Sequence, residues 1–290
     1  MSKTIVGLGE VLTDQFPDYE KPGGAPANVV YNLGQLGNEA LLVSAVGADE
    51  TGRMLRTFLA KNGLDTRYVQ ESGKPSGTVK VTFSGSEASY DITQDVAWDD
   101  IRWNPGLQEL ASRTHAVCFS TLSQRSETSA ATIQRFLQAV PSDCLRVLDV
   151  NLRPPFFSRE TIEASLRLAN VVKVNEHEYA DIEALLGQGD LRGLLLHEFG
   201  LRLLIVTLGK NGSRCITADT DTHYPTQPID TSTGDSVGVG DAFIACVIHH
   251  LLKETPMPET MRLANRYAGY VASQQGAMVS FDPQFLSEIR

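Results

Sequence analysis

The stretch that decides the fold class is VVKVNEHEYADIEALL, residues 171–186. Its first four residues, Val171–Val174, are mostly β-branched, which is typical of a strand buried on both faces. In the residues that follow, Tyr179, Ile182 and Leu186 recur at helical spacing. A buried strand that leads directly into a helix is one part of a βαβ unit, so this stretch predicts a parallel sheet covered by helices.

The same alternation of β-branched runs and helical patterns extends along the chain in both directions. Strands are predicted at Thr4–Leu8, Ala40–Val46, Ala116–Ser120, Leu145–Val150, Val171–Val174 and Leu203–Leu208. Helices are predicted at Pro26–Leu36, Thr51–Asn62, Ser126–Ala139, Arg159–Leu168, Glu176–Leu186, Asp190–Phe199, Val239–Leu252 and Pro258–Gln275. This order predicts a doubly wound α/β fold with a mostly parallel sheet, in a chain of 290 residues that is long enough for a substantial core.

One segment, residues 76–93, departs from this alternation. Its apolar residues lie at alternate positions on both sides of a turn at residues 85–87, and they are Val79, Val81, Phe83, Tyr90 and Ile92. The pattern predicts an antiparallel hairpin with one apolar face. Because an isolated ribbon is marginally stable in water, this face is expected to cover the main domain, a ligand or another subunit. A lid over a ligand and an edge extension of the large sheet both fit the pattern.

Charge and composition exclude several classes of protein. The chain has 25 Lys and Arg against 35 Asp and Glu, a formal net charge of −10, so nucleic acid and anionic membrane surfaces are not expected partners. No apolar run approaches the roughly 18 residues of a membrane-spanning helix, and the first residues show no signal-peptide pattern. The four cysteines, Cys118, Cys144, Cys215 and Cys246, lie far apart and are predicted to be buried, reduced thiols. These features predict a cytoplasmic protein.

Residues 235–243, DSVGVGDAF, carry the strongest chemical signal. Small residues begin a predicted helix here, and the backbone N–H groups of such a helix start bind anions. Asp241, in the same turn, can accept a hydroxyl proton while the neighbouring amides hold a phosphoryl group under attack. An acidic residue near a helix N-terminus is also a common stabilising feature, so this motif alone leaves both interpretations open.

Three further motifs lie where predicted strands end or helices begin. Asn175 and Glu178 follow a strand end, where open α/β sheets bind ligands, and they either hold a hydrated Mg²⁺ ion or cap the helix. The sequence GGAPAN, residues 23–28, suits contact between backbone amides, the Asn28 amide and a polyhydroxyl ligand, and equally suits a tight loop before a helix. The sequence VTLGKNG, residues 206–212, by itself indicates only a hairpin.

Two common types of site are disfavoured by the sequence. GLGEVL, residues 7–12, has Leu12 where the dinucleotide-binding fingerprint has its third glycine, which disfavours a nicotinamide dehydrogenase. The chain contains no Gly-Lys-Ser or Gly-Lys-Thr of a P-loop. The pair His249 and His250 is expected to form a polar edge of a helix rather than a zinc site.

Taken together and in this order, these motifs resemble the PfkB family of carbohydrate kinases, which has the ribokinase-like fold. The similarity runs from residues 7–10 through residues 23–28 to Gly276-Ala277, and therefore covers essentially the whole chain. Its most specific part, residues 235–241, is similar to the family's Asp-Thr-x-Gly-Ala-Gly-Asp signature, with Val239 in place of Ala. The resemblance implies one ribokinase-like domain over residues 1–290, with lid strands from about residues 10–24 and 76–96.

The resemblance also implies roles for the residues of the phosphoryl-transfer site. Asp241 is implied to be the catalytic base. The anion hole for the transferred phosphoryl group is implied to consist of Gly238, Val239 and Gly240. Mg²⁺ and the phosphates are implied to be ordered through water by Asn175 and Glu178. Asp235 and the turn at Gly276 resemble the loops that hold a K⁺ ion in many members of the family.

Binding residues for the two substrates follow from the same resemblance. The nucleotide is implied to contact Lys173 at its phosphates, Asn265 near adenine, and a loop that includes Thr207, Gly209 and Gly212. The sugar hydroxyls are implied to contact Asp14, Gly24, Asn28 and Arg153.

Within the family the chain looks most like fructokinases, on residues 33–37 and 149–155. This similarity implies an ATP- and Mg²⁺-dependent kinase that transfers the γ-phosphoryl group to a primary hydroxyl of a sugar, with fructose as the first expectation. Ribokinase, nucleoside kinase and 2-keto-3-deoxygluconate kinase activities are the alternatives. A non-catalytic sugar-binding regulator is a further alternative, although it would normally have lost the base or an anion-hole glycine. The lids of two subunits pack together in some members, so a homodimer through the lid is expected.

Overall fold

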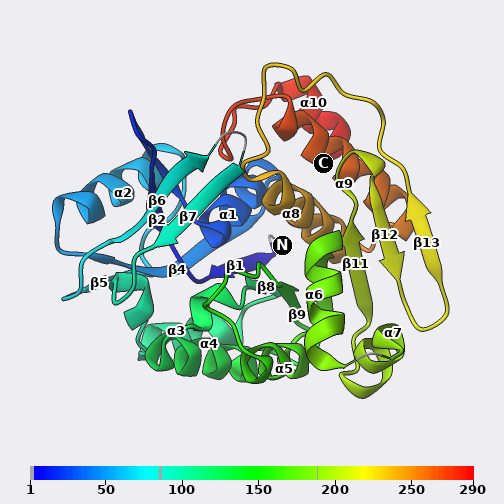
Figure 1. Cartoon of the computed structure of the whole chain (residues 1–290), viewed down its shortest axis with the longest axis horizontal. Helices are drawn as coiled ribbons and strands as arrows, with labels where there is room; N and C mark the ends of the chain where they lie inside the picture. The colour runs from blue at the N-terminus through cyan, green and yellow to red at the C-terminus, as the bar shows by residue number, and fades with distance from the viewer. Residues whose placement is uncertain (1–2, 85–86, 188) are drawn as a thin grey trace.

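The computed structural model describes residues 3–84, 87–187 and 189–290, and a nine-stranded sheet runs through its centre (Figure 1). The strand order is β13-β12-β11-β10-β9-β8-β1-β4-β5. All neighbours from β11 to β5 are parallel, whereas β12 and β13 form an antiparallel edge beside β11. The strands are β1 Thr4–Leu8, β4 Glu39–Gly47, β5 Val69–Ser72, β8 Ala116–Phe119, β9 Leu145–Asp149, β10 Val171–Asn175, β11 Leu203–Thr207, β12 Ser213–Ile216 and β13 Asp221–Tyr224.

Helices cover both faces of this sheet because successive strand residues point to opposite sides. In β1, Ile5 packs with Val247 of α8, whereas Val6 packs on the other side with Phe136 of α4. One layer contains α1 Ala25–Gln35, α2 Glu50–Lys61, α8 Val239–Leu252, α9 Met257–Ala272 and α10 Pro283–Ile289. The other contains α3 Pro105–Ser112, α4 Glu127–Ala139, α5 Arg159–Leu168, α6 Glu176–Leu186 and α7 Leu191–Gly193.

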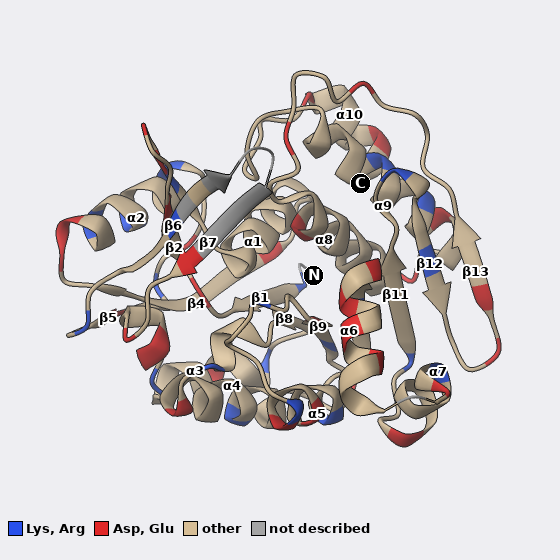
Figure 2. Ribbon diagram, viewed as in Figure 1, with Lys and Arg blue, Asp and Glu red and all other residues tan. Residues whose placement is uncertain are grey.

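The predicted doubly wound α/β fold is confirmed, and all six predicted strands are present with ends that differ by one residue at most. The hairpin indicated at residues 206–212 is confirmed as the antiparallel pair β11 and β12. The sequence pattern did not reveal β5, β13, α3 or α10, which are short elements of four to eight residues. Figure 2 shows charged residues of both signs along α4 and α5. None of the described helices is long and apolar enough to span a membrane.

The helix predicted at residues 190–199 has a different form. Only Leu191–Gly193 is α-helical, and Leu194–Glu198 forms a wider π-helical turn. Leu195 and Leu196 are both buried in this turn. The wider turn brings these two consecutive leucines into the core, which a regular amphipathic helix with one apolar stripe does less well.

The prediction for His249 and His250 was wrong, because both side chains are buried within α8 rather than exposed along its edge. His249 Nδ1 lies 3.0 Å from Asn38 Nδ2, and His250 Nδ1 lies 3.1 Å from Thr255 Oγ1. Burial lowers the pKa of His249 to about 4. The pair is therefore part of the packing between α8 and its neighbours. The four cysteines are buried and free, as predicted.

A second, four-stranded sheet in the order β3-β2-β6-β7 lies apart from the large sheet. Its strands are β2 Leu12–Gln15, β3 Glu20–Gly23, β6 Gly77–Ser84 and β7 Glu87–Ile92. The predicted hairpin is confirmed as the antiparallel pair β6 and β7, in which Val79 pairs with Ile92. The interpretation of this hairpin as an edge extension of the large sheet is wrong, because β6 pairs in parallel with β2 instead.

The inner side of the hairpin is apolar where it is described. Val79 and Ile92 are buried in one cluster with Leu12 of β2 and with Trp98, which belongs to the short 3₁₀ helix Ala97–Asp100. The predicted face continues with Val81, Phe83 and Tyr90, whose side chains lie outside the described part of the structure. The turn residues Gly85 and Ser86 also lie outside it.

Candidate active site

Gly238 directly precedes helix α8, at a point where the chain has no room for a side chain. The backbone there is left-handed, with φ of 72°. An ideal Cβ at this position would lie 2.2 Å from the Cβ of Ala277, in the segment after α9. No described side chain caps the helix, so the backbone N–H groups of Val239 and Gly240 in its first turn remain available to an anion.

Asp241 lies in the first turn of α8 and meets Asn28 of α1. The Asn28 Nδ2 group donates a hydrogen bond of 2.8 Å to Asp241 Oδ2. These residues are 213 positions apart in the sequence, and the packing of α1 against α8 brings them together. The predicted base and one predicted sugar-binding residue therefore share one point of the molecule.

The surroundings of Asp241 favour its protonated form. Burial raises the pKa of the carboxyl to about 7, and the negative charge of Asp149 adds to the rise. The Asn28 amide and the Lys173 ammonium act in the opposite direction. A carboxylate with a pKa near neutral pH is suited to exchange a proton with a substrate.

Lys173 of β10 and Asp149 of β9 form a buried ion pair at paired positions of two adjacent strands. Lys173 Nζ lies 3.0 Å from Asp149 Oδ1, and the two side chains are 9% and 8% exposed. Burial alone lowers the pKa of Lys173, but the carboxylates of Asp149 and Glu178 outweigh burial, and the net pKa is raised. An ideal Cβ at Gly240 would lie 3.1 Å from Lys173 Nζ, so the ammonium group lies beside the first turn of α8.

Asn175 and Glu178 form a capping box at the start of α6. Asn175 Oδ1 accepts hydrogen bonds from the backbone N–H groups of His177 and Glu178, each 2.9 Å long. Glu178 Oε2 accepts from the Asn175 N–H at 2.9 Å, and Oε1 accepts from the Leu152 N–H at 3.2 Å. The capping alternative recognised in the sequence is therefore present. Each carboxylate oxygen retains a lone pair for a water molecule.

The residues predicted to bind sugar come from the small sheet, from the start of α1 and from the segment after β9. Burial raises the pKa of Asp14 in β2 to about 6, and the nearby charge of Arg153 opposes this rise. Gly24 precedes α1 with φ of 116°, and an ideal Cβ there would lie 2.5 Å from the carbonyl oxygen of Glu10. Arg153 is exposed, and its Nη1 donates to the carbonyl of Leu152.

Glu10 was not among the predicted site residues, although it lies near Gly24 and Arg153, which were. Its side chain is 2% exposed, and burial raises its pKa. The carboxylate accepts hydrogen bonds from Ser123 Oγ and from the backbone N–H of Ala25, at 3.3 Å for the latter. Glu10 thereby fixes the start of α1 to the loop after β8. The position of an acidic residue directly after the first glycine-rich strand was the available signal.

On the predicted nucleotide side, Thr207 ends β11, and Gly209 and Gly212 flank the hairpin turn to β12. The Asn265 amide of α9 is bonded to this hairpin at both ends, because its Oδ1 accepts from Ser213 Oγ at 3.1 Å and its Nδ2 donates to the Tyr224 carbonyl at 3.0 Å. Asn265 also borders a small pocket of about 90 Å³, lined in addition by Pro225, Gln227, Arg262 and Arg266.

Asp235 connects the loop before α8 to the turn after α9. Its Oδ1 accepts from the Val237 N–H at 2.9 Å, and its Oδ2 accepts from the Gly276 N–H at 3.0 Å. Ser236 sits in a Gly-x-Ser-x-Gly spacing, residues 234–238, but this segment is an exposed loop and not the strand–turn–helix that positions a nucleophilic serine.

A family model described as pfkB family carbohydrate kinase matches residues 10–284. The chain belongs to the PfkB family of carbohydrate kinases. This PfkB-family kinase is 30% identical to an uncharacterized sugar kinase of Pyrococcus horikoshii, over 94% of this chain and 91% of the relative. The solved structure of that relative, in complex with ATP, covers 99% of this chain and 100% of its own with a TM-score of 0.84.

Two further comparisons describe the range of the family. A fructokinase of Salmonella typhimurium is 27% identical over 98% of both chains. The structure of an aminoimidazole riboside kinase from Salmonella enterica shares the fold, with a TM-score of 0.83, 23% identity and coverage of 99% of each chain. The ribokinase-like fold of this carbohydrate kinase agrees with the expectation from its sequence.

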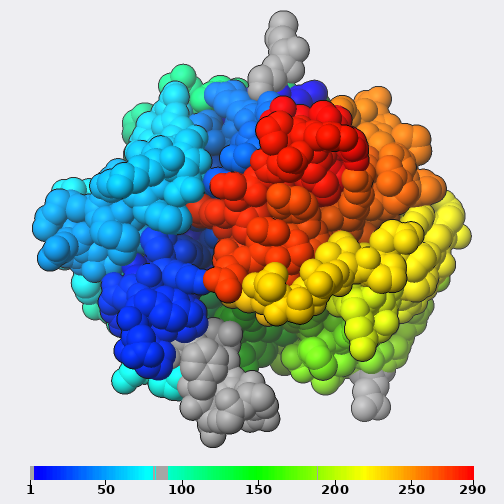
Figure 3. Space-filling view, turned by 90° about the horizontal axis from the view of Figure 1, so that it is seen from above, coloured from blue at the N-terminus to red at the C-terminus, as the bar shows by residue number. Residues whose placement is uncertain are grey.

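The structure of this PfkB-family kinase brings several of the predicted site residues together at the start of α8. Figure 3 shows the chain of β2 and β3 in dark blue, the segment after α9 in red-orange and the loop before α8 in yellow, all on one face. Asp241, Asn28, Lys173 and Asp149 meet at the first turn of α8. Asn265 lies farther along α9, against β12 and β13.

Proposed function

We propose that this kinase transfers the γ-phosphoryl group of ATP to a primary hydroxyl of a sugar, with fructose as the first candidate. The observation that carries the proposal is the position of Asp241. Its pKa is about 7, it lies in the uncapped first turn of α8, and it accepts a hydrogen bond from Asn28. A general base beside free backbone amides suits proton removal coupled to phosphoryl transfer.

In the proposed reaction, Asp241 accepts the proton of the sugar hydroxyl. The hydroxyl oxygen forms the new bond to the γ-phosphorus, the bond between that phosphorus and the β–γ bridging oxygen breaks, and ADP leaves. The backbone N–H groups of Gly238, Val239 and Gly240 and the ammonium group of Lys173 stabilise the negative charge on the transferred group. The chemistry then depends mainly on positioning and charge stabilisation.

The proposed nucleotide is ATP, which the Pyrococcus horikoshii relative binds in its solved structure. Its phosphates would lie near Lys173, with the loop that contains Thr207, Gly209 and Gly212 beside the nucleotide. Because both ends of the Asn265 amide bond within the protein, its orientation is fixed, and this residue would form part of the wall near adenine.

The residues present fit a Mg²⁺ ion that is held through water. Each Glu178 oxygen already accepts one backbone N–H group, so Glu178 and Asn175 would orient water ligands of the ion. When bound with ATP, Mg²⁺ neutralises phosphate charge. K⁺ beside Asp235 is part of the same proposal, and so is a cytoplasmic location.

The proposed sugar site consists of Asp14, Gly24, Asn28 and Arg153. Carboxylate, amide and guanidinium groups suit a ligand with several hydroxyls. Fructose is favoured because the Salmonella typhimurium fructokinase aligns over nearly all of both chains. Ribose, a nucleoside and 2-keto-3-deoxygluconate are the alternatives, and the shared fold of the aminoimidazole riboside kinase supports the nucleoside among them. The presence of the base and of the anion-hole glycines argues against a non-catalytic regulator.

A coupled assay for ADP release tests the proposal, with fructose, ribose, nucleosides and keto-deoxy acids as acceptors. The proposal predicts release with at least one acceptor, fastest with fructose, and release slower by about 10²–10⁴ with the Asp241→Asn variant. If no acceptor raises ADP release by the wild-type enzyme above the rate without acceptor while a sugar still binds, the chain is a sugar-binding regulator and the proposed reaction is wrong.

A further inference from the structure

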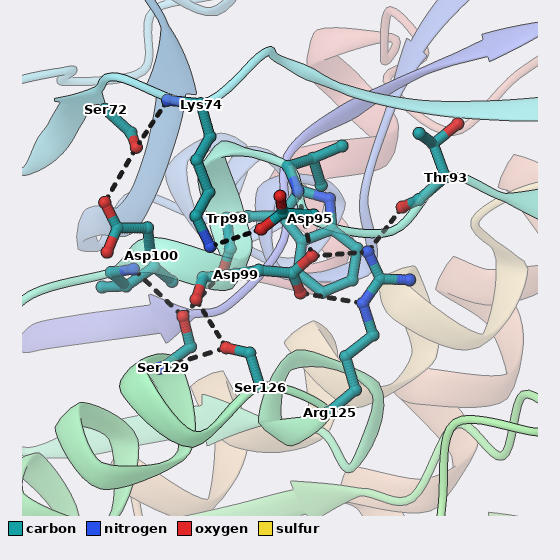
Figure 4. A network of polar contacts seen from close by, with 12 residues as sticks. Ser72, Lys74, Thr93, Asp95, Trp98, Asp99, Asp100, Arg125, Ser126 and Ser129 are labelled. Carbon is teal, nitrogen blue, oxygen red and sulfur yellow. Dashed lines mark hydrogen bonds and ion pairs between the residues drawn. The ribbon is translucent and has the colours of Figure 1, made fainter.

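A buried ion pair ties the exit of the β6–β7 hairpin to the main domain (Figure 4). Arg125 follows the short 3₁₀ helix Leu122–Gln124 and donates from Nε and Nη2 to the two carboxylate oxygens of Asp99, both at 2.8 Å. The same Nη2 donates to the carbonyl oxygen of Thr93, the first residue after β7. We call Arg125, Asp99 and the Thr93 carbonyl the Arg125 clamp.

Within the clamp, both the orientation of the Arg125 guanidinium and its distance from the Asp99 carboxylate are fixed. Arg125 and Asp99 are 5% and 4% exposed, and their contact is bidentate. The ring of Trp98 lies 3.8 Å from the guanidinium carbon (Figure 4). A planar, buried, bidentate pair restricts rotation of the guanidinium group. A lysine at the same position retains the positive charge but cannot form this geometry.

A second aromatic ring connects the clamp to the proposed sugar site. The ring of Phe156 lies 4.8 Å from the guanidinium carbon of Arg125. The Phe156 backbone N–H donates to the carbonyl of Arg153 at 2.8 Å, so both residues belong to one tight turn. Burial raises the pKa values of Asp14 and Glu10, and the nearby positive charge of Arg153 opposes both rises. One guanidinium therefore contacts the hairpin exit and the turn that carries Arg153.

The start of the hairpin is held by different residues. The Asp49 carboxylate accepts from the Ser76 backbone N–H at 2.8 Å and from Ser76 Oγ at 2.6 Å. Lys74 pairs with Asp95 at 2.8 Å, but the Asp95 side chain is 84% exposed, and solvent screens such a pair strongly. The Arg125 clamp is therefore the buried charged connection on the exit side of the hairpin.

We propose that Arg125 is a positioning residue that fixes the hairpin and the Arg153 turn relative to each other, and so assembles the sugar site. The proposal relies on the proposed function for the identity of the ligand as a sugar. The mechanical connection between hairpin and turn does not depend on that identity. Arg125 acts through Phe156 and Thr93, while the residues proposed for the nucleotide lie at β10, β11 and α8. Replacement of Arg125 should therefore weaken sugar binding more than nucleotide binding.

The first experiment compares Arg125→Lys with Arg102→Lys in steady-state kinetics. Arg102 is a matched control because it pairs with Asp100, next to Asp99, yet is 74% exposed. Arg125→Lys should raise the KM for sugar by about tenfold, the change that corresponds to roughly 1.4 kcal/mol, with the KM for ATP nearly unchanged. Arg102→Lys should leave both values unchanged. Equal effects of Arg125→Lys on both substrates would indicate general destabilisation and would overturn the proposal.

A double-mutant cycle tests the connection through Phe156. Phe156→Leu keeps an apolar side chain but removes the ring beside the guanidinium. If Arg125 positions the Arg153 turn through this ring, the double variant Arg125→Lys/Phe156→Leu should raise the sugar KM no more than the larger single effect. Additive effects would show two independent contacts and contradict the coupling.

Hydrogen exchange of the unliganded protein provides a readout that does not depend on kinase activity. Arg125→Lys should speed exchange of the β7 amides several-fold relative to wild type, without a change in the amides of α2, and Arg102→Lys should not. If exchange responds in this way but no sugar supports ADP release, the clamp stands and the proposed function fails. If exchange in β7 and the sugar KM are both unchanged, the proposed positioning role of Arg125 is wrong, whatever the substrate is.

Discussion

The pH dependence of turnover should report the ionisation of Asp241. Burial and the charge of Asp149 raise its pKa to about 7. Because a general base acts only when deprotonated, kcat/KM for the sugar should be near its plateau at pH 8, half of the plateau at pH 7 and roughly one tenth at pH 6. The rate is thus lost as the pH falls through the pKa of the folded enzyme.

The Asn28→Ala variant tests the structural origin of that pKa. Asn28 donates a hydrogen bond of 2.8 Å to the Asp241 carboxylate, and this bond lowers the pKa of Asp241. Removal of the amide should therefore raise that pKa. A hydrogen bond to a charged group contributes roughly 1.5–3 kcal/mol when well buried. Asp241 is partly exposed, so about 1 kcal/mol is a more suitable value, and at about 1.4 kcal/mol per pH unit the inflection should move from pH 7 to nearly pH 8. The plateau should also fall, since Asn28 is proposed to contact the sugar.

Initial rates of ADP release at sub-saturating sugar, from pH 5.5 to 9 at constant ionic strength, measure both profiles. Asn62→Ala is a suitable control, because Asn62 also donates its amide, to the carbonyl of Phe58, but at the far end of α2. Its inflection should equal that of wild type. A wild-type profile that is flat across this range, or an Asn28→Ala inflection that does not move upward, would refute the assignment of Asp241 as the titrating base.

Three further predictions concern the anion hole, the metal and the hairpin. Gly238→Ala introduces a Cβ 2.2 Å from that of Ala277 at φ of 72°, so kcat should fall by roughly tenfold or more, and normal turnover would contradict the proposed anion hole. Glu178→Gln should raise the Mg²⁺ concentration for half-maximal rate more than it weakens sugar binding; an unchanged requirement would leave Glu178 with a capping role only. Replacement of Val81 and Phe83 with Ser should weaken sugar binding and loosen the expected dimer in sedimentation, with ATP binding retained; unaltered mass and sugar affinity would show that the hairpin is no lid.

The parts of the fold that the sequence predicts are those governed by local periodicity. Val171–Val174 and Glu176–Leu186 are correct to within a residue because a buried strand and an amphipathic helix each repeat their own pattern. The edge strand β13 was missed because it has only four residues, and Asp221–Tyr224 is mostly exposed, so no apolar pattern marks it. His249 and His250 were placed wrongly because polarity alone does not show that neighbouring helices enclose a residue.

Contacts between distant segments were beyond what a sequence pattern specifies. The family resemblance proposes roles for Asn28 and Asp241, but only the packing of α1 on α8 shows that they bond to each other. The same holds for Glu10 with Ser123 and for Arg125 with Asp99. The capping role of Asn175 was visible in advance, because a capping box depends on residues only three positions apart.

The most direct test of the central claim is ADP release by Asp241→Asn, measured beside ATP binding by calorimetry. This substitution retains the shape of the side chain and its place beside Asn28 but cannot accept the hydroxyl proton. The predicted result is a loss of turnover by about 10²–10⁴ with ATP affinity retained, because the base is removed while the nucleotide residues are untouched. Turnover close to that of wild type in the purified, folded variant would contradict the account.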